Sequence, residues 1–212
     1  MKKLITIFLF VILLTGCQNV NKSSADKIIS NAVDSKKDYT NVVRVGYKYY
    51  KPSLMSIIES TEYNEVLRSN DKLYYLYIDV IGYYNKVKYN YVENELAYYS
   101  KSFSRDNKEG YIEINELKDN QYLIEIVYNY AKIEVMVDKA SINEAIAYAS
   151  SIISSVKYND VVINKKLGTT FVNSYEETID LFKKKKNDST TLKIVESDHY
   201  DKDVIPDMDL VN

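Results

Sequence analysis

The stretch YLIEIVYN at residues 122–129, with KIEVMVD at residues 132–138 close behind it, decides the fold. Apolar and aromatic side chains alternate along the first segment, so one face of a strand would carry Tyr122, Ile124, Ile126 and Tyr128. Glu125 and Asn129 would point the other way. Because β-branched and aromatic residues dominate both segments, we expect two neighbouring strands of one sheet.

More stretches of this kind come earlier in the chain, at residues 42–50, 57–69, 73–84, 95–103 and 111–117. Segments such as SNDK, RDNKEG and KDNQ separate them, and their Asn, Asp and Gly residues tolerate turn conformations. The connections are too short for crossover helices, which predicts that consecutive strands pair as an antiparallel meander. Gly82 lies inside the longest stretch and indicates a bulge or bend. The segment DVVINKKL, residues 160–167, would form a last strand.

Two helices are predicted on either side of these strands. The first, residues 24–36, follows Ser23 and Ser24, which can cap its exposed amide groups. The second is longer and begins at Ser141, where Glu144 completes a capping box ahead of a continuous apolar face. That face would pack across the sheet.

The last part of the chain changes character. A third helix is predicted from the capping box of Ser174 and Glu177 to the lysines of residues 183–186, whose charges complement a helix C-terminus. Residues 187–212 then hold seven acidic and two basic side chains and few apolar ones. This composition predicts a flexible or extended acidic tail.

The order of these elements predicts an α+β fold, in which an antiparallel β-sheet meander carries a long amphipathic helix on one face. An N-terminal helix, a C-terminal helix and the flexible tail complete it. The predicted divisions are a signal peptide at 1–16, a lipidated tether at 17–22, an α+β globular domain at 23–167, the C-terminal helix at 168–186 and the tail at 187–212.

Two segments within the globular domain carry a family resemblance. YKYYKPSLMSII at residues 47–58 and AIAYASSIISSVKYN at residues 145–159 resemble the start and the end of Mog1/PsbP-like lipoprotein domains. The resemblance covers residues 41–167. It implies a domain that assists assembly or binds a partner without performing chemistry, although a fold alone does not assign a function.

The N-terminus has the layout of an export signal. Lys2 and Lys3 precede an apolar run at residues 4–14, which is shorter than the roughly 20 residues that span a bilayer as a helix. The following LTGC, ending at Cys17, resembles the lipobox of bacterial lipoproteins. The resemblance implies that the Cys17 thiol carries diacylglycerol and begins the mature chain. The alternative is that Cys17 is a small apolar residue of a signal helix.

Composition excludes several classes of function. The 212 residues carry 28 basic and 30 acidic side chains, and a net charge of −2 argues against nucleic acid as the main partner. Cys17 is the single cysteine, so the chain can form neither an internal disulfide nor a cysteine zinc site. The sequence suggests no cofactor or metal site.

The tail offers three candidate sites. His199 is the only histidine, and a histidine in a tail is more commonly solvated than catalytic. Five aspartates could bind calcium, but their spacing is wrong for an EF-hand and favours a solvated tail: Asp198, Asp201, Asp203, Asp207 and Asp209. Residues 204–212 mix apolar and acidic side chains around Pro206, as a short partner-binding segment would.

Other charged groups have simple explanations. The lysines of residues 183–186 could contact anionic lipid, but a helix C-terminus already accounts for them. Glu113 and Glu116 are predicted to be ordinary surface charges of a strand.

Tyrosine is unusually frequent, with 22 residues and no tryptophan. Codon usage of an AT-rich genome and core packing would explain most of them. The alternative is an exposed aromatic surface on neighbouring strands, which suits protein or glycan contacts. Its candidate residues are Tyr75, Tyr77, Tyr83, Tyr84, Tyr98 and Tyr99.

The sequence therefore predicts a lipoprotein held by Cys17 on the outer face of the cytoplasmic membrane, with an AT-rich composition favouring a single-membrane bacterium. We expect a non-enzymatic binding or scaffold domain for an extracytoplasmic protein partner. The alternative is a lipoprotein that binds cell-wall glycan or a small ligand through exposed tyrosines. A hydrolase using His199 has the least support.

Overall fold

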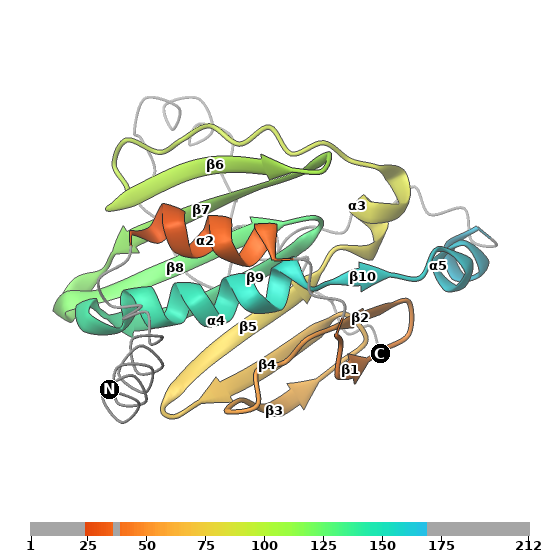
Figure 1. Cartoon of the computed structure of the whole chain (residues 1–212), viewed down its shortest axis with the longest axis horizontal. Helices are drawn as coiled ribbons and strands as arrows, with labels where there is room; N and C mark the ends of the chain where they lie inside the picture. Colours follow the sequence, from red (N-terminus) through yellow and green to blue (C-terminus); the bar gives the residue numbers. More distant parts are fainter. Residues whose placement is uncertain (1–23, 36–38, 169–212) are drawn as a thin grey trace, which may run out of the picture.

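A computed structural model of the chain describes residues 24–35 and 39–168. It has an α+β fold in two layers, which confirms the predicted fold class (Figure 1). The helices α2 (Ala25–Asp34) and α4 (Ile142–Ser154) lie side by side on one face of a large antiparallel sheet. The predicted signal, tether, helix at 174–186 and tail lie outside the described residues.

The large sheet has seven strands in the spatial order β3-β4-β5-β9-β8-β7-β6. Their bounds are Ser56–Ser60 for β3, Asn64–Ser69 for β4, Lys72–Ile78 for β5, Tyr99–Arg105 for β6, Lys108–Glu116 for β7, Gln121–Tyr128 for β8 and Ala131–Asp138 for β9. A smaller sheet joins β1 (Val42–Val43), β2 (Tyr47–Tyr49) and β10 (Lys157–Tyr158) in that order. All pairings in both sheets are antiparallel.

The meander prediction is right within each half of the large sheet and wrong at their junction. Consecutive strands pair from β3 to β5 and from β6 to β9, but β5 pairs with β9 instead of β6. The chain leaves β5 through the short helix α3 (Val80–Asn85) and residues 86–98, which run along β6 at the far edge (Figure 1). Closing the sheet through β9 places the apolar strands β8 and β9 in its interior.

The predicted alternation in β8 is confirmed. Tyr122, Ile124, Ile126 and Tyr128 belong to the buried core beneath α2 and α4. A two-residue turn joins β8 to β9, and its residues Asn129 and Tyr130 have positive φ angles of 50° and 63°. Positive φ at both central positions is the type I′ geometry that matches the twist of a hairpin. Glu125 faces the other way, as predicted, yet it is only 1% exposed.

Two long predicted strands each fold back on themselves. Residues 42–50 divide into β1 and β2 because Gly46 adopts a φ of 89°, which only glycine reaches without strain. Residues 57–69 contain β3 and β4, joined by a turn in which the Thr61 amide donates to the Asn64 carbonyl at 2.8 Å. Each predicted long strand is therefore a pair of short strands, and β1 and β3 become edge strands of their sheets.

The first predicted helix is confirmed, and the capping box of the second is wrong. Ser24 caps α2 by accepting a hydrogen bond from the Lys27 amide at 3.4 Å. At α4, however, the Ser141 side chain caps nothing, because its hydroxyl donates to Asp138 at 2.9 Å. Asp138 also accepts from the Ser141 amide at 3.0 Å and caps a short 3-10 turn, η4 (Lys139–Ser141), that leads into the helix.

Residues 160–167 form the helix α5 (Asp160–Leu167), so the prediction of a last strand is wrong. Asn159 caps this helix by accepting from the Val162 amide at 3.2 Å. Asp160 in the first turn and the lysines Lys165 and Lys166 in the last turn complement the helix dipole. Terminal capping and charge therefore outweigh the strand preference of two adjacent valines.

The predicted bulge at Gly82 is also wrong, because the strand ends at Ile78 and Gly82 lies in α3. The Asp79 carboxylate caps this helix, accepting from the Gly82 amide at 2.6 Å. The same carboxylate accepts from the Tyr89 hydroxyl at 2.7 Å. A Cβ atom on Gly82 would lie 2.1 Å from Asp79 Oδ2.

A buried acid joins the small sheet to the large one. The Glu65 side chain of β4 is fully buried and pairs with Arg44 at 2.8 Å. It also accepts hydrogen bonds from the hydroxyls of Tyr47 and Tyr49 on β2. Burial and this carboxylate hold the pKa of both tyrosines above the ordinary range, so they remain donors.

We predict that Gly82→Ala destabilises the fold by about 1–2 kcal/mol, because Asp79 would have to move and lose its two hydrogen bonds. Chemical denaturation of the purified protein measures the loss. Asn85→Ala, at an exposed position of the same helix, is the control and should change stability by less than about 0.5 kcal/mol. Equal stability of the two variants would contradict the role given to Asp79.

Candidate binding groove

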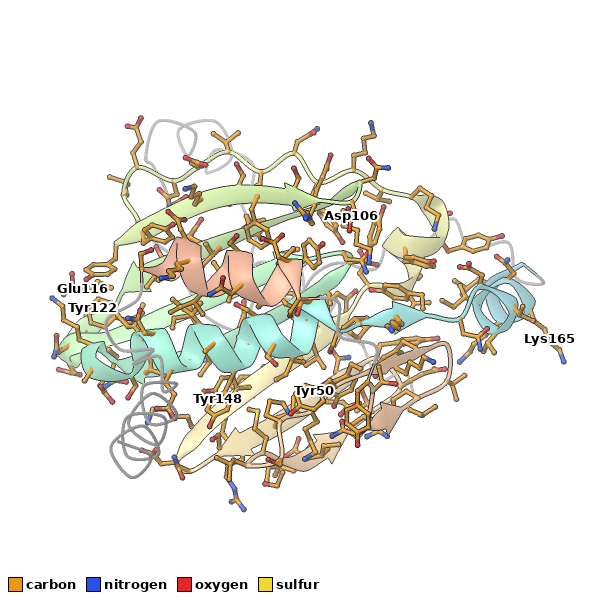
Figure 2. The ribbon with its side chains drawn as sticks, in the orientation of Figure 1. Tyr50, Asp106, Glu116, Tyr122, Tyr148 and Lys165 are labelled. Atoms are coloured by element: carbon orange, nitrogen blue, oxygen red, sulfur yellow. The ribbon has the colours of Figure 1, made fainter. Side chains whose placement is uncertain are left out.

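A groove lies at the end of the sheet where the hairpins β6–β7 and β8–β9 turn. Its first wall holds both turns, Asp106–Asn107 and Asn129–Tyr130, in which all four residues have positive φ. Its second wall is segment 86–92, which begins at Lys86, the left-handed C-cap residue of α3, and continues without helix or strand. Figure 2 labels Asp106 at this end of the sheet, and labels Glu116 and Tyr122 at the opposite end.

The segment 86–92 alternates like a strand. Val87, Tyr89 and Tyr91 are half-buried against the domain. The exposed residues between and beside them are Lys86, Lys88, Asn90 and Val92. One side of this segment therefore holds it in place, and the other side presents Lys86, Lys88, Asn90 and the apolar Val92 to solvent.

Two tyrosines fix the segment to the sheet. The Tyr91 ring stacks on Tyr111 of β7 with ring centres 3.8 Å apart, and its hydroxyl donates to Glu113 at 2.7 Å. The Tyr89 hydroxyl donates to Asp79 at 2.7 Å. Burial raises the pKa of both tyrosines, and the hydrogen bonds to Asp79 and Glu113 add to the increase, whereas the hydrogen bond between Tyr91 and Ser100 opposes it. Both hydroxyls therefore stay protonated near neutral pH and serve as donors.

Tyr130 adopts a conformation that is unusual for a bulky side chain. Its φ of 63° lies in the left-handed region, which Asn and Gly occupy more readily. Its carbonyl accepts from the Asp79 amide at 2.8 Å. Its ring lies 5.6 Å from the rings of both Tyr83 and Tyr89, between centres. These contacts offset the backbone strain and hold the ring at the groove.

The groove consists of two hollows that share Lys88, Tyr89 and Glu109. The larger, about 610 Å³, lies between segment 88–92 and the strands β6 and β7. The smaller, about 250 Å³, lies between the two hairpin turns and residues 86–89. The charged residues among those described in its lining are Lys86, Lys88, Lys108 and Glu109.

This arrangement suits binding by stacking and hydrogen bonding. It combines half-buried aromatic rings with ammonium, amide and hydroxyl groups on an open surface. Within residues 24–35 and 39–168, no group of three or more His, Cys, Asp and Glu side chains is arranged to hold a metal ion. The groove therefore has the chemistry of a recognition site for a polar ligand with apolar faces.

A second polar cluster lies on the sheet face opposite the helices. Glu113, Glu125 and Glu134 stand directly opposite one another on β7, β8 and β9. Their exposed fractions are 5%, 1% and 1%. Like charges in this position destabilise a sheet unless they are compensated. We call these three residues the glutamate row.

Several groups compensate the glutamate row. Tyr111 donates to Glu125 at 2.8 Å, and Asn115 donates to Glu113 at 2.8 Å. Lys132 is itself buried and donates to Glu134 at 3.2 Å. Burial is the main cause that raises the pKa of Glu134 to about 7. The hydrogen bond with Glu125 raises this pKa further, whereas the positive charge of Lys132 lowers it. A proton shared between neighbouring carboxyls relieves their repulsion.

The tyrosines predicted to form one exposed surface are distributed over three places. Tyr75 and Tyr77 are half-buried on β5, on the face of the glutamate row. Tyr83 and Tyr84 lie in α3, where Tyr83 stacks on Tyr158 and donates to Asp160. The last pair lies where β6 begins. Tyr98, just before the strand, is 49% exposed, and Tyr99, its first residue, donates to Asp26 of α2.

These six residues do not share a surface because β5 and β6 are not neighbours. Three strands separate them in the sheet. The groove instead uses Tyr89, Tyr91 and Tyr130, which are not among these six residues. A signal for Tyr130 was present, since a tyrosine takes the place of glycine in a two-residue turn between strong strands.

The prediction for Glu113 is wrong and that for Glu116 is right. Glu113 is buried in the glutamate row, whereas Glu116 is exposed at the end of β7. Sequence alternation alone assigns both faces of a strand but does not tell which polar face is covered. Cys17, His199, the aspartates of the tail and residues 183–186 lie outside the described residues.

Comparison with known proteins identifies the N-terminus. Residues 1–18 match the family model of the prokaryotic membrane lipoprotein lipid attachment site, and Cys17 lies within the match. The chain is therefore a membrane-anchored lipoprotein, as its lipobox predicts. No curated protein matches the chain. The described helices include none that is long and apolar enough to cross a membrane.

We predict that Glu134→Gln changes how stability depends on pH. The folded state keeps the Glu134 proton up to about pH 7, whereas the unfolded chain loses it near the ordinary value of 4.5. The wild type therefore loses stability as pH rises through this window, and the variant lacks this loss. Near pH 8 the variant should be more stable by about 1–2 kcal/mol, with a much smaller difference near pH 5.

Denaturation at a series of pH values measures this difference. Glu116→Gln is the control, because Glu116 is exposed on β7 and outside the glutamate row. Parallel stability curves for Glu134→Gln and the wild type would show that Glu134 titrates like an exposed carboxylate.

Proposed function

We propose that this lipoprotein is a non-enzymatic binding protein on the outer face of the cytoplasmic membrane of a single-membrane bacterium, and that its groove binds an extended glycan of the envelope. The observation that carries the proposal is the pairing of ordered tyrosine rings with polar groups along an open groove. Sugars present apolar C–H faces and hydroxyl rims, which such a lining complements.

The rigidity of the groove supports binding. Tyr89, Tyr91 and Tyr130 are already fixed by hydrogen bonds or ring contacts within the domain. A ligand would therefore not have to order them, which lowers the entropic cost of association. The two hollows adjoin at Lys88, Tyr89 and Glu109, so an extended chain could occupy both.

The groove hydroxyls stay protonated and are engaged within the domain. Tyr89 and Tyr91 have raised pKa values and donate to Asp79 and Glu113, so at neutral pH they hold the lining in place. The lipid anchor keeps the domain at the membrane, where it would meet glycan as a surface component. Anchoring also raises the effective concentration for a ligand in the same envelope layer.

We predict that Tyr130→Asn weakens binding of a soluble N-acetylglucosamine hexamer by about five- to tenfold, because it removes one ring and keeps a residue that accepts positive φ. Calorimetry with the full-length protein in detergent measures the affinity. Tyr98→Asn, an exposed tyrosine outside the groove lining, is the control and should bind like the wild type. Loss of binding only in the control would favour the sequence-predicted surface.

A protein partner is the second candidate, and a different observation favours it. The edge strands β1 and β3 carry exposed apolar side chains, with Val43 71% and Ile58 41% exposed. An exposed strand edge can pair with an added strand of a partner. The proposed partner would be an extracytoplasmic protein of the envelope that adds a strand to β3.

Crosslinking in cells tests this candidate. Ile58→Lys should remove β3-dependent crosslinks to envelope proteins, because a charged residue on an edge opposes strand addition. Val161→Lys changes an apolar side chain that is 78% exposed on α5, and it is the control that should retain them. An identical crosslink pattern in both variants would exclude docking at β3.

A further inference from the structure

We infer that the ligand of the groove is a polyanionic glycan whose units are linked by phosphodiester groups. This inference rests on the proposed function and adds the chemical class of the glycan. The supporting observation is the arrangement of three lysines in the groove.

The lysines come from two parts of the chain and converge on one groove. Lys86 and Lys88 lie on segment 86–92, and Lys108 begins β7 after the hairpin turn. Glu109 lines both hollows, and Asp106 in the adjoining turn has Arg105 as its counter-charge at 4.0 Å. The groove is therefore locally positive, although the whole chain has a net charge of −2.

These three lysines have no ion pair among the described residues. Lysines that do form ion pairs lie elsewhere in the described ranges, among them Lys72, Lys101, Lys132 and Lys166. Lys86 instead lies over the Tyr83 ring at 3.6 Å from its centre. Lys86, Lys88 and Lys108 line the same hollow, so a bound anion could interact with their positive charges there.

The position of the lysines suits a polymer in which sugar or polyol units alternate with phosphate groups. Lys86 and Lys88 are exposed, whereas Val87, Tyr89 and Tyr91 face the domain. Aromatic surface and positive charge thus alternate along the same segment. Lys88, Tyr89 and Tyr91 nevertheless line the same hollow, so sugar or polyol units could contact the accessible part of the rings while the linking phosphates contact the ammonium groups.

Anionic lipid headgroups offer the same phosphate chemistry. They lack a repeated chain that would follow both hollows, and they would leave the aromatic lining without a partner. The structure therefore favours the polymer over the membrane surface as the source of the phosphate.

Binding of full-length lipidated protein in phosphatidylcholine nanodiscs tests the inference. The probes are poly(glycerol phosphate), the neutral N-acetylglucosamine hexamer, and vesicles containing phosphatidylglycerol. We expect poly(glycerol phosphate) to bind at least about tenfold more tightly than the hexamer, with an affinity that falls steeply as salt rises. The double variant Lys88→Gln with Lys108→Gln should lose about tenfold in affinity for the polymer and respond less to salt.

The matched control is Lys118→Gln, an exposed lysine in the β7–β8 connection at the other end of the sheet, which should bind as the wild type does. Equal binding of polymer and neutral hexamer, unchanged in the double variant, would overturn the inference and leave the proposed function standing. Binding to anionic vesicles alone would overturn it in favour of lipid headgroups. Failure of every probe would overturn both the inference and the proposed function.

Discussion

The pairing of β8 with β9 across the Asn129–Tyr130 turn is the constraint on which the rest of the structure depends. Its register sends Ile124 and Ile133 toward the helices and sets Glu125 opposite Glu134 on the other face. A slip of one residue would exchange these faces and bury charges in the apolar core. The same turn places the Tyr130 ring at the groove, so this one hairpin positions residues of both the core and the candidate site.

Much of the fold could be predicted because its signals are local. Period-two alternation in residues 122–138 and the turn residues between strands identify the antiparallel sheet, and apolar spacing identifies α2 and α4. The pairing of β5 with β9 could not be predicted, because it depends on where α3 and residues 86–98 carry the chain. Residues 160–167 were misassigned because adjacent valines suit a strand, whereas the cap at Asn159 determines the helix.

The candidate site was predictable only in its residue type. Tyrosine was recognised as the unusual component, but grouping the tyrosines required knowing that β5 and β6 lie apart. Tyr89 and Tyr91 belong to a segment without backbone pairing in the sheet, and side-chain hydrogen bonds to Asp79 and Glu113 fix its position. The glutamate row was missed for a related reason, since strand alternation does not tell which polar face is covered. The lipid attachment site needed no structure, because its chemistry lies in a short continuous segment.

The helix α2 gives the anchored protein a mechanical junction. It begins at Ala25, eight positions after Cys17, so a pull between membrane and domain enters the fold through this helix. Asp26 accepts a hydrogen bond from Tyr99 and forms an ion pair with Lys101, and Asp34 forms an ion pair with Arg105 at 3.2 Å. Ile28 and Ile29 are buried in the core. Force along the helix axis loads these contacts together, whereas lifting from the first turn loads them in succession. The direction of the pull therefore decides whether the helix holds or peels from the sheet.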